Sequence, residues 1–181
     1  MFNKEKKANS NLLSSQPTGI LIFENGLSIP AIGIGHKGYS VGEVCFNTSM
    51  TGYQEIITDP SYSDQIINFT FPHIGNVGTN FEDIESEKVW LKGVVFAKEI
   101  AEPSNYRSFE KLNFWLEKNQ IVGVVGVDTR AITNLIRIKG AMKATIVNGD
   151  IADTKKYLEE CKNWPGLKGM ELTKKVTTQQ I

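Results

Sequence analysis

The stretch from Gly42 to Asn80, GEVCFNTSMTGYQEIITDPSYSDQIINFTFPHIGNVGTN, decides how this chain folds. Two segments rich in β-forming residues, Gly42–Asn47 and Gln65–Phe71, flank a polar connector. The connector is crowded with hydroxyl groups and has little apolar surface to bury, so its side chains can bond the backbone or a ligand. The sequence therefore predicts two strands joined by a polar loop with functional potential.

Within the connector, Asp59-Pro60-Ser61 predicts a tight turn. Proline fixes φ near the value that the second turn position needs, and the Asp59 carboxylate can accept a backbone N–H. Such a turn presents the Ser61 hydroxyl outward. The chemistry alone leaves two interpretations open, because Ser61 is either an ordinary turn serine or a fixed donor for a ligand.

Several runs in this stretch also carry a resemblance. They are GEV (residues 42–44), FNTSMTGYQE (46–55), TDPSY (58–62) and PHIGNVG (72–78), and further along the chain SNYR (104–107), VDTR (127–130), KGA (139–141), WPGLKGM (164–170) and KVTT (175–178). Together they resemble the N-terminal domain of the small, glutamine-hydrolysing chain of carbamoyl-phosphate synthase. The resemblance covers nearly the whole chain from about Gly19 onward.

The resemblance implies an α/β domain with a three-layer β/β/α architecture. It implies that the chain belongs to a subunit that supplies ammonia from glutamine to a large subunit, which makes carbamoyl phosphate for arginine and pyrimidine synthesis. This domain would bind the large subunit and form one wall of the glutamine site, where Ser61 contacts the glutamine. No catalytic residue and no cofactor is expected in this chain, since ATP and a divalent metal belong to the large subunit.

The resemblance also divides the chain. Residues 1–18 are rich in Lys, Asn and Ser and predict a disordered tail, residues 19–170 form the domain, and residues 171–181 form a linker toward an absent glutamine amidotransferase domain. That absent domain carries the cysteine nucleophile on a Gly-x-Cys-x-Gly turn, with a His–Glu pair. We therefore expect this chain alone to be inactive. The alternative is a non-catalytic module from a truncated gene, which only binds the large subunit.

Composition limits the other functional classes. The 181 residues include 20 basic and 20 acidic side chains, and this zero net charge argues against a nucleic-acid partner. No apolar run is long enough to cross a membrane, and the N-terminus lacks the apolar core of a signal peptide. The sequence predicts a cytoplasmic protein with no membrane contact.

The segment Gly33–Gly38 matches the pattern G-x-G-x-x-G of dinucleotide-binding proteins. That site needs a helix directly after the motif, because the helix N-terminus holds the pyrophosphate. Here the following residues favour a strand, so the motif predicts a glycine-rich turn between strands. A nucleotide-binding oxidoreductase is therefore the weaker hypothesis.

The other candidates for chemistry are also better explained by structure. Cys45 lies in an alternating strand and Cys161 on a helical face, and neither follows the strand-to-helix turn of a nucleophile. His36 and His73 have no metal-ligand spacing, so a turn and a loop contact are expected for them. The acidic residues between Glu82 and Glu87 predict a solvated connector rather than a metal site.

The remaining periodicities predict a mixture of strands and helices. The predicted strands form a hairpin over 20–34 around Asn25-Gly26 and three further strands over 94–97, 120–127 and 141–147. The first predicted helix is capped by Ser108 and has Phe109 on its buried face. The second is capped by Asp128 or Thr129 and closed by Gly140, and the third runs over 153–162. The order of strands first and then strand–helix alternation predicts a layered α/β domain.

Overall fold

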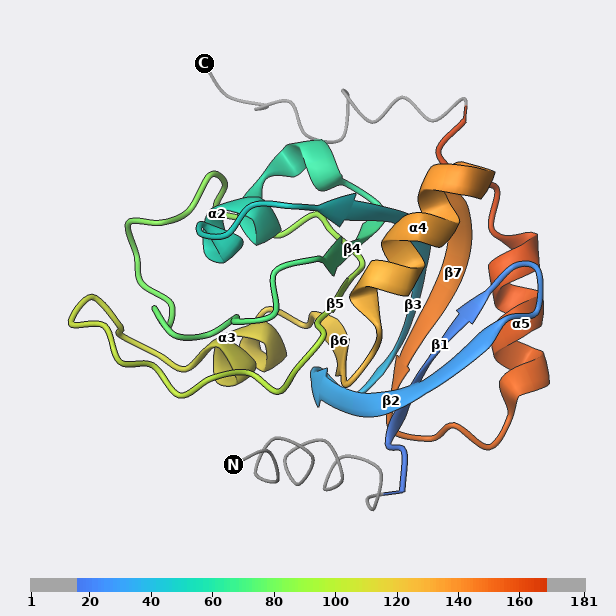
Figure 1. Cartoon of the computed structure of the whole chain (residues 1–181), viewed down its shortest axis with the longest axis horizontal. Helices are drawn as coiled ribbons and strands as arrows, with labels where there is room; N and C mark the ends of the chain where they lie inside the picture. The colour runs from blue at the N-terminus through green and yellow to red at the C-terminus, as the bar shows by residue number, and fades with distance from the viewer. Residues whose placement is uncertain (1–15, 169–181) are drawn as a thin grey trace, which may run out of the picture.

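A computed structural model describes residues 16–168, whose strands close into a ring in the order β1-β2-β6-β5-β4-β3-β7 (Figure 1). These strands are β1 (Gly19–Phe23), β2 (Ser28–Gly35), β3 (Gly38–Asn47), β4 (Gln65–Phe69), β5 (Gly93–Val95), β6 (Val122–Val125) and β7 (Met142–Asn148). Strands β3 to β6 run parallel, and antiparallel pairs with β1, β2 and β7 complete the ring.

The helices of the described residues lie outside the ring or across its end (Figure 1). They are α2 (Tyr53–Thr58), the 3-10 turn η1 (Pro60–Tyr62), α3 (Leu112–Lys118), α4 (Thr129–Lys139) and α5 (Thr154–Asn163). Helix α5 packs on β1 and β7, and α3 packs on β2 and β6. The mixed α/β class is confirmed. The three-layer arrangement implied by the resemblance is not confirmed, because the strands form one closed barrel.

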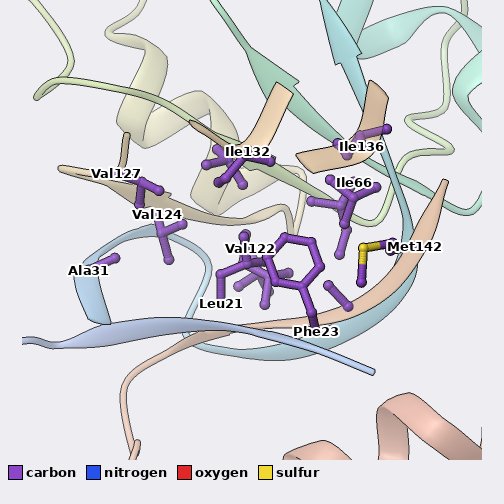
Figure 2. Packing of buried hydrophobic residues seen from close by; sticks show 14 residues of the cluster. Leu21, Phe23, Ala31, Ile66, Val122, Val124, Val127, Ile132, Ile136 and Met142 are labelled. Carbon is purple, nitrogen blue, oxygen red and sulfur yellow. The ribbon is translucent and has the colours of Figure 1, made fainter. Parts of the chain in front are cut away.

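The barrel interior is filled by alternate residues of its strands. On β1, Leu21 and Phe23 point into the ring, while Ile20 and Ile22 point outward and pack with Tyr157 of α5. Figure 2 shows the Phe23 ring at the centre of this cluster. The other buried members are Ala31, Val44, Ile66, Val95, Val122, Val124, Val127, Ile132, Ile136, Met142, Ala144 and Ile146. This period of two explains why β1 is buried on both faces.

A second apolar cluster covers the outer face of the parallel strands. It joins Ile67 and Phe69 of β4 to Val94 of β5, with Tyr53 and Ile57 of α2. Leu91, Phe96, Leu112, Leu116, Ile121, Val125 and Ile74 complete its buried part. Because both faces of β4 and β5 are covered, their sequences read as continuous apolar runs rather than as alternating patterns.

Helix α4 is fixed to the barrel by a buried amide. The side chain of Asn68 on β4 is fully buried, and its Nδ2 donates to the Thr129 carbonyl at 2.9 Å and to Thr133 Oγ1 at 3.0 Å. Asp128 is the N-cap, since its carboxylate accepts from the Ala131 N–H at 2.9 Å. Ile132 then enters the interior cluster. Helix α4 therefore closes one end of the barrel, and of the two caps predicted, Asp128 and Thr129, the helix uses Asp128.

The glycine-rich motif is the turn between β2 and β3, as predicted. The Asn148 Nδ2 lies 3.0–3.2 Å from the carbonyl oxygens of Ile34, Gly35 and His36. A Cβ at Gly33 would lie 2.0 Å from the Asn148 Oδ1, and a Cβ at Gly35, where φ is 65°, would lie 2.4 Å from the Ile121 carbonyl. These glycines admit a close packing of backbone against Asn148, which accounts for the motif without a nucleotide.

Two local predictions are wrong. The helix predicted from Ser108 begins at Leu112, because Glu110 instead forms a β-bridge with Thr79. Phe109, placed on the buried face of that helix, is 68% exposed. The hairpin predicted around Asn25-Gly26 is confirmed, because β1 pairs antiparallel with β2 on either side of this turn.

The domain boundaries stay predictions. Most of the tail predicted over 1–18, and the linker predicted over 171–181, lie outside the described residues. At the inner edge of the tail, the Thr18 N–H donates to the Ala31 carbonyl at 3.1 Å, and the Gly149 N–H donates to the Thr18 carbonyl at 2.8 Å. Regular hydrogen bonding to the sheet therefore includes Thr18.

Candidate functional site

The polar connector contains a helix that the hydroxyl-rich composition concealed. Helix α2 begins after Gly52, whose φ of 76° is left-handed, and it buries Tyr53 and Ile57 on the outer cluster. The sequence does contain a pattern that predicts this helix, because Tyr53, Ile56 and Ile57 recur at helical spacing. The connector is therefore a packed element whose polar groups have fixed positions.

The turn predicted at Asp59-Pro60-Ser61 is confirmed. The Ser61 N–H donates to the Asp59 Oδ1 at 2.8 Å, and the Ser63 N–H donates to the Pro60 carbonyl at 3.1 Å. Ser61 is exposed, and its hydroxyl has no hydrogen-bond partner among residues 16–168. The outward direction of the side chain agrees with the prediction, whereas the contact with glutamine stays a prediction.

Contacts with the sheet hold this turn on both sides. The Asn47 Nδ2, at the end of β3, donates to the Tyr62 hydroxyl at 3.0 Å. Asp64 is buried and has φ 59°. Its carboxylate forms an ion pair with Lys92, whose Nζ lies 3.0 Å from the Asp64 Oδ1. The main chain on each side of Ser61 is therefore anchored, which fixes the direction in which the hydroxyl points.

A second polar region lies at the other end of α2. The Tyr53 hydroxyl donates to the Gly78 carbonyl at 2.6 Å, and Gln54 and Asn80 exchange bonds of 2.7 and 2.9 Å. Arg107 donates to Asp83 at 2.6 Å beside a cavity of about 230 Å³. The pKa of the Asp83 carboxyl is lowered, chiefly by the hydrogen bond from Asn80 and then by Arg107, while partial burial opposes the shift.

Sequence patterns alone do not predict this second region. Its partners are far apart in the chain, since Arg107 and Asp83 are separated by 24 residues and Tyr53 and Gly78 by 25. The acidic residues that were predicted to be a solvated connector do include one partly buried carboxylate, on Asp83. The arrangement immobilises two loops and brings no nucleophile and base together.

Neither cysteine has the properties of a nucleophile. Burial raises the pKa of the Cys45 thiol to about 12, and the thiol lies 3.8 Å from the Ile66 carbonyl. Cys161 is fully buried on α5, and burial raises its pKa to about 11. At neutral pH both remain thiols, whereas the thiolate is the reactive form. The prediction of a core residue is confirmed for Cys161, whereas Cys45 is only partly buried beside the outer cluster.

The histidines likewise form no catalytic pair. His36 contributes backbone groups to the β2–β3 turn. His73 is exposed, and its ring packs edge-on against Phe71 with the ring centroids 5.7 Å apart. Within residues 16–168, no three His, Cys, Asp or Glu side chains cluster closely enough to hold a metal ion.

No helix in the described part of the chain is both long enough and apolar enough to cross a membrane.

Comparison with known proteins identifies the family. Residues 21–146 match the family model described as carbamoyl-phosphate synthase small chain, CPSase domain. The chain is 49% identical over 172 residues to the carbamoyl phosphate synthase small chain of Bradyrhizobium diazoefficiens, covering 91% of this chain and 43% of that protein. It is 50% identical over 176 residues to that of Bartonella quintana, covering 92% and 44%, and 50% identical over 163 residues to that of Pectobacterium atrosepticum, covering 90% and 43%.

The chain thus spans less than half the length of the curated relatives it matches. The match nevertheless extends over about nine-tenths of this chain and includes the barrel, the connector and helix α4. The resemblance stated from the residues alone is confirmed. The chain therefore belongs to the carbamoyl-phosphate synthase small-chain family.

Proposed function

We propose that this chain is part of the glutamine-hydrolysing small subunit of a carbamoyl phosphate synthase. The subunit releases ammonia from glutamine and delivers it to a large subunit, which makes carbamoyl phosphate for arginine and pyrimidine synthesis. The share of this chain is to bind the large subunit and to form one wall of the glutamine site. The observation that carries the proposal is the 49–50% identity with proteins named as small chains over nine-tenths of this chain.

Ser61 is the residue of this chain that we assign to glutamine. Its hydroxyl is exposed on a turn whose backbone is already ordered by Asp59, so donating to a carboxylate or amide oxygen costs little conformational entropy. The segment around residue 60 and the end of the described chain after α5 lie along the same upper side of the view in Figure 1. A domain that continued from the end of the described chain would start on the same side of the barrel as this segment.

The first prediction concerns the isolated chain. We expect the purified 181-residue protein to bind the large subunit of the same organism and to release no ammonia from glutamine, because the raised pKa of each cysteine keeps both thiols protonated at neutral pH. Calorimetric titration measures the binding, and an ammonia assay measures the hydrolysis. Glutamine hydrolysis by the isolated chain would contradict the assigned role, and absence of binding would contradict the partner.

The second prediction concerns Ser61→Ala in the complete small subunit assembled with its large subunit. Loss of one hydrogen bond of about 1 kcal/mol should lower glutamine-dependent synthesis about fivefold. Ammonia-dependent synthesis should not change, because free ammonia bypasses the glutamine site. Ser49→Ala is the matched control, since Ser49 is an exposed serine of the same connector whose N–H is bonded to Asn47. Equal loss of both activities would show that Ser61 has a structural role.

A binding role without catalysis is the second candidate. It is favoured by the two thiols, because Cys161 is buried, Cys45 is partly buried, and burial raises the pKa of both. The intact mass of the endogenous polypeptide separates the two candidates. A mass well above 20.2 kDa supports a complete glutaminase subunit, and a mass equal to it supports a binding module.

A further inference from the structure

Three aromatic side chains are exposed together on the loops before and after β5. Phe81 is 70% exposed, Tyr106 is 95% exposed and Phe109 is 68% exposed. The rings of Phe81 and Phe109 pack against each other with centroids 4.4 Å apart and an angle of 54°. We call these three residues the aromatic surface. Clustered exposed aromatic rings are typical of binding sites, whereas isolated exposed apolar residues are common on any surface.

The surface is hollowed on both sides of the aromatic pair. One hollow, of about 400 Å³, is lined by the aromatic surface together with Asn80, Glu82, Arg107 and Ser108. The other, of about 140 Å³, lies between the pair and helix α3, where Trp115 and Lys118 contribute to its wall. Aromatic rings beside recesses that a partner's side chains can fill are the usual composition of an interface hot spot.

The backbone beneath the aromatic surface is held in one conformation. The Phe109 N–H donates to the Thr79 carbonyl at 2.9 Å, and the Thr79 N–H donates to the Glu110 carbonyl at 2.9 Å. Asn80 is bonded to Gln54 of α2, and its Oδ1 accepts from the Glu82 and Asp83 N–H groups. A partner therefore does not have to order these loops, so less of the binding energy is lost as conformational entropy.

Charged groups border the aromatic surface. Arg107 Nη2 lies 2.6 Å from Asp83 and 3.1 Å from Glu82, and the Lys111 Nζ lies 2.8 Å from Glu102. A centre of aromatic rings with an arginine and a rim of charged groups matches the composition of protein–protein interfaces. It suits a protein partner better than a small ligand, because small ligands are mostly enclosed by their sites.

The position of the surface argues against its being covered by more of the same chain. The described residues end shortly after α5, which packs on β1 and β7. In Figure 1 the loops between residues 79 and 110 lie on the left, and α5 lies at the far right. A segment that continues after α5 would therefore begin on the opposite side of the barrel. A separate chain is the occupant that this arrangement favours.

We propose that the aromatic surface is the site at which this chain binds the large subunit of the synthase. The inference rests on the function proposed above, which supplies the partner, and it adds the residues that carry the contact. Phe81 and Phe109 are the central anchors, Tyr106 extends the contact, and the hollows on either side receive side chains of the large subunit.

The test compares variants of the whole 181-residue chain in calorimetric titrations with the purified large subunit of the same organism. We expect the double variant Phe81→Ser/Phe109→Ser to bind about tenfold more weakly or worse, since loss of hot-spot residues has this effect. Ile138→Ser is the matched control, because Ile138 is 79% exposed on α4, away from the aromatic surface, and its variant should bind as the wild type does. Tyr106→Ser, at a side chain 95% exposed, replaces the double variant should that variant fail to fold.

Each other outcome overturns a defined part of the inference. If the wild type binds and the aromatic variants bind equally well, the surface is wrong while the proposed function stands. If the wild type does not bind the large subunit, the proposed function fails and the aromatic surface loses its assigned partner with it. If sedimentation shows that the wild type self-associates and the double variant does not, the occupant is a second copy of this chain.

Discussion

Phe23→Ala should lower the free energy of unfolding by about 3–5 kcal/mol, the range measured for removing a buried phenylalanine ring from a core. The Phe23 side chain is fully buried at the centre of the barrel interior, where Figure 2 shows it surrounded by side chains from several strands. Because the strands close into a ring, the surrounding backbone cannot move inward far enough to fill the space. The cost should therefore lie at the upper end of the range.

Denaturant-induced unfolding, followed by circular dichroism, measures this effect. Phe114→Ala is the matched control, because Phe114 lies on α3 and is 58% exposed, so its loss should change stability by less than about 0.5 kcal/mol. A cost for Phe23→Ala that is no larger than the cost for Phe114→Ala would contradict the interior packing.

Asn68→Asp should be of similar severity at neutral pH, at about 3 kcal/mol or more. The substitution barely changes the size of the side chain, but it removes the Nδ2 that donates to Thr129 and Thr133. It also places a carboxylate beside the Thr129 carbonyl at a position with no exposed surface. Helix α4 would lose its anchor on β4 and face an unpaired charge.

The pH dependence of stability in this variant shows whether the loss comes from a buried charge or from altered packing. Burial favours the neutral acid, so the pKa of the new carboxyl is higher in the folded protein than its value of about 3.9 in the unfolded chain. Relative to wild type, the variant is therefore least destabilised below about pH 4, and the cost grows as pH rises from there to the folded-state pKa. Unfolding curves at a series of pH values measure this difference.

The control for Asn68→Asp is Asn105→Asp. Asn105 is exposed, and its Oδ1 accepts from the Arg107 N–H, a bond that a carboxylate also makes. This variant should unfold like the wild type at every pH. A pH-independent cost for Asn68→Asp would indicate lost packing instead of a buried charge.

The strands and most helices could be predicted because their signals are local. Strand β1 follows from the apolar run after Gly19, and α4 follows from its cap at Asp128 and its apolar spacing. The turn at Ser61 is likewise determined within five residues by Asp59 and Pro60. These are the cases in which propensity, capping and turn chemistry agree.

The features that could not be predicted depend on contacts between distant residues. Ser108 has the chemistry of a helix cap, yet the chain continues extended because Thr79 pairs with Glu110. The same pairing exposes Phe109 and so creates part of the aromatic surface. Closure of the ring depends on seven strand pairings, three of which join strands that are not neighbours in sequence, so alternation indicated strands but not the barrel.

Closure of the ring also determines when each strand can find its partners while the chain is being synthesised. Strand β1 pairs with β7, so Gly19 leaves the ribosome long before its partner Asn148. At about 5–20 residues per second, the delay over these 129 positions (148 − 19) is roughly 6–26 s. Through this interval β1 can pair only with β2, so one edge of β1 stays unpaired. For these seconds the nascent chain therefore has an unpaired strand edge that can pair with other chains. The barrel is completed only when β7 emerges.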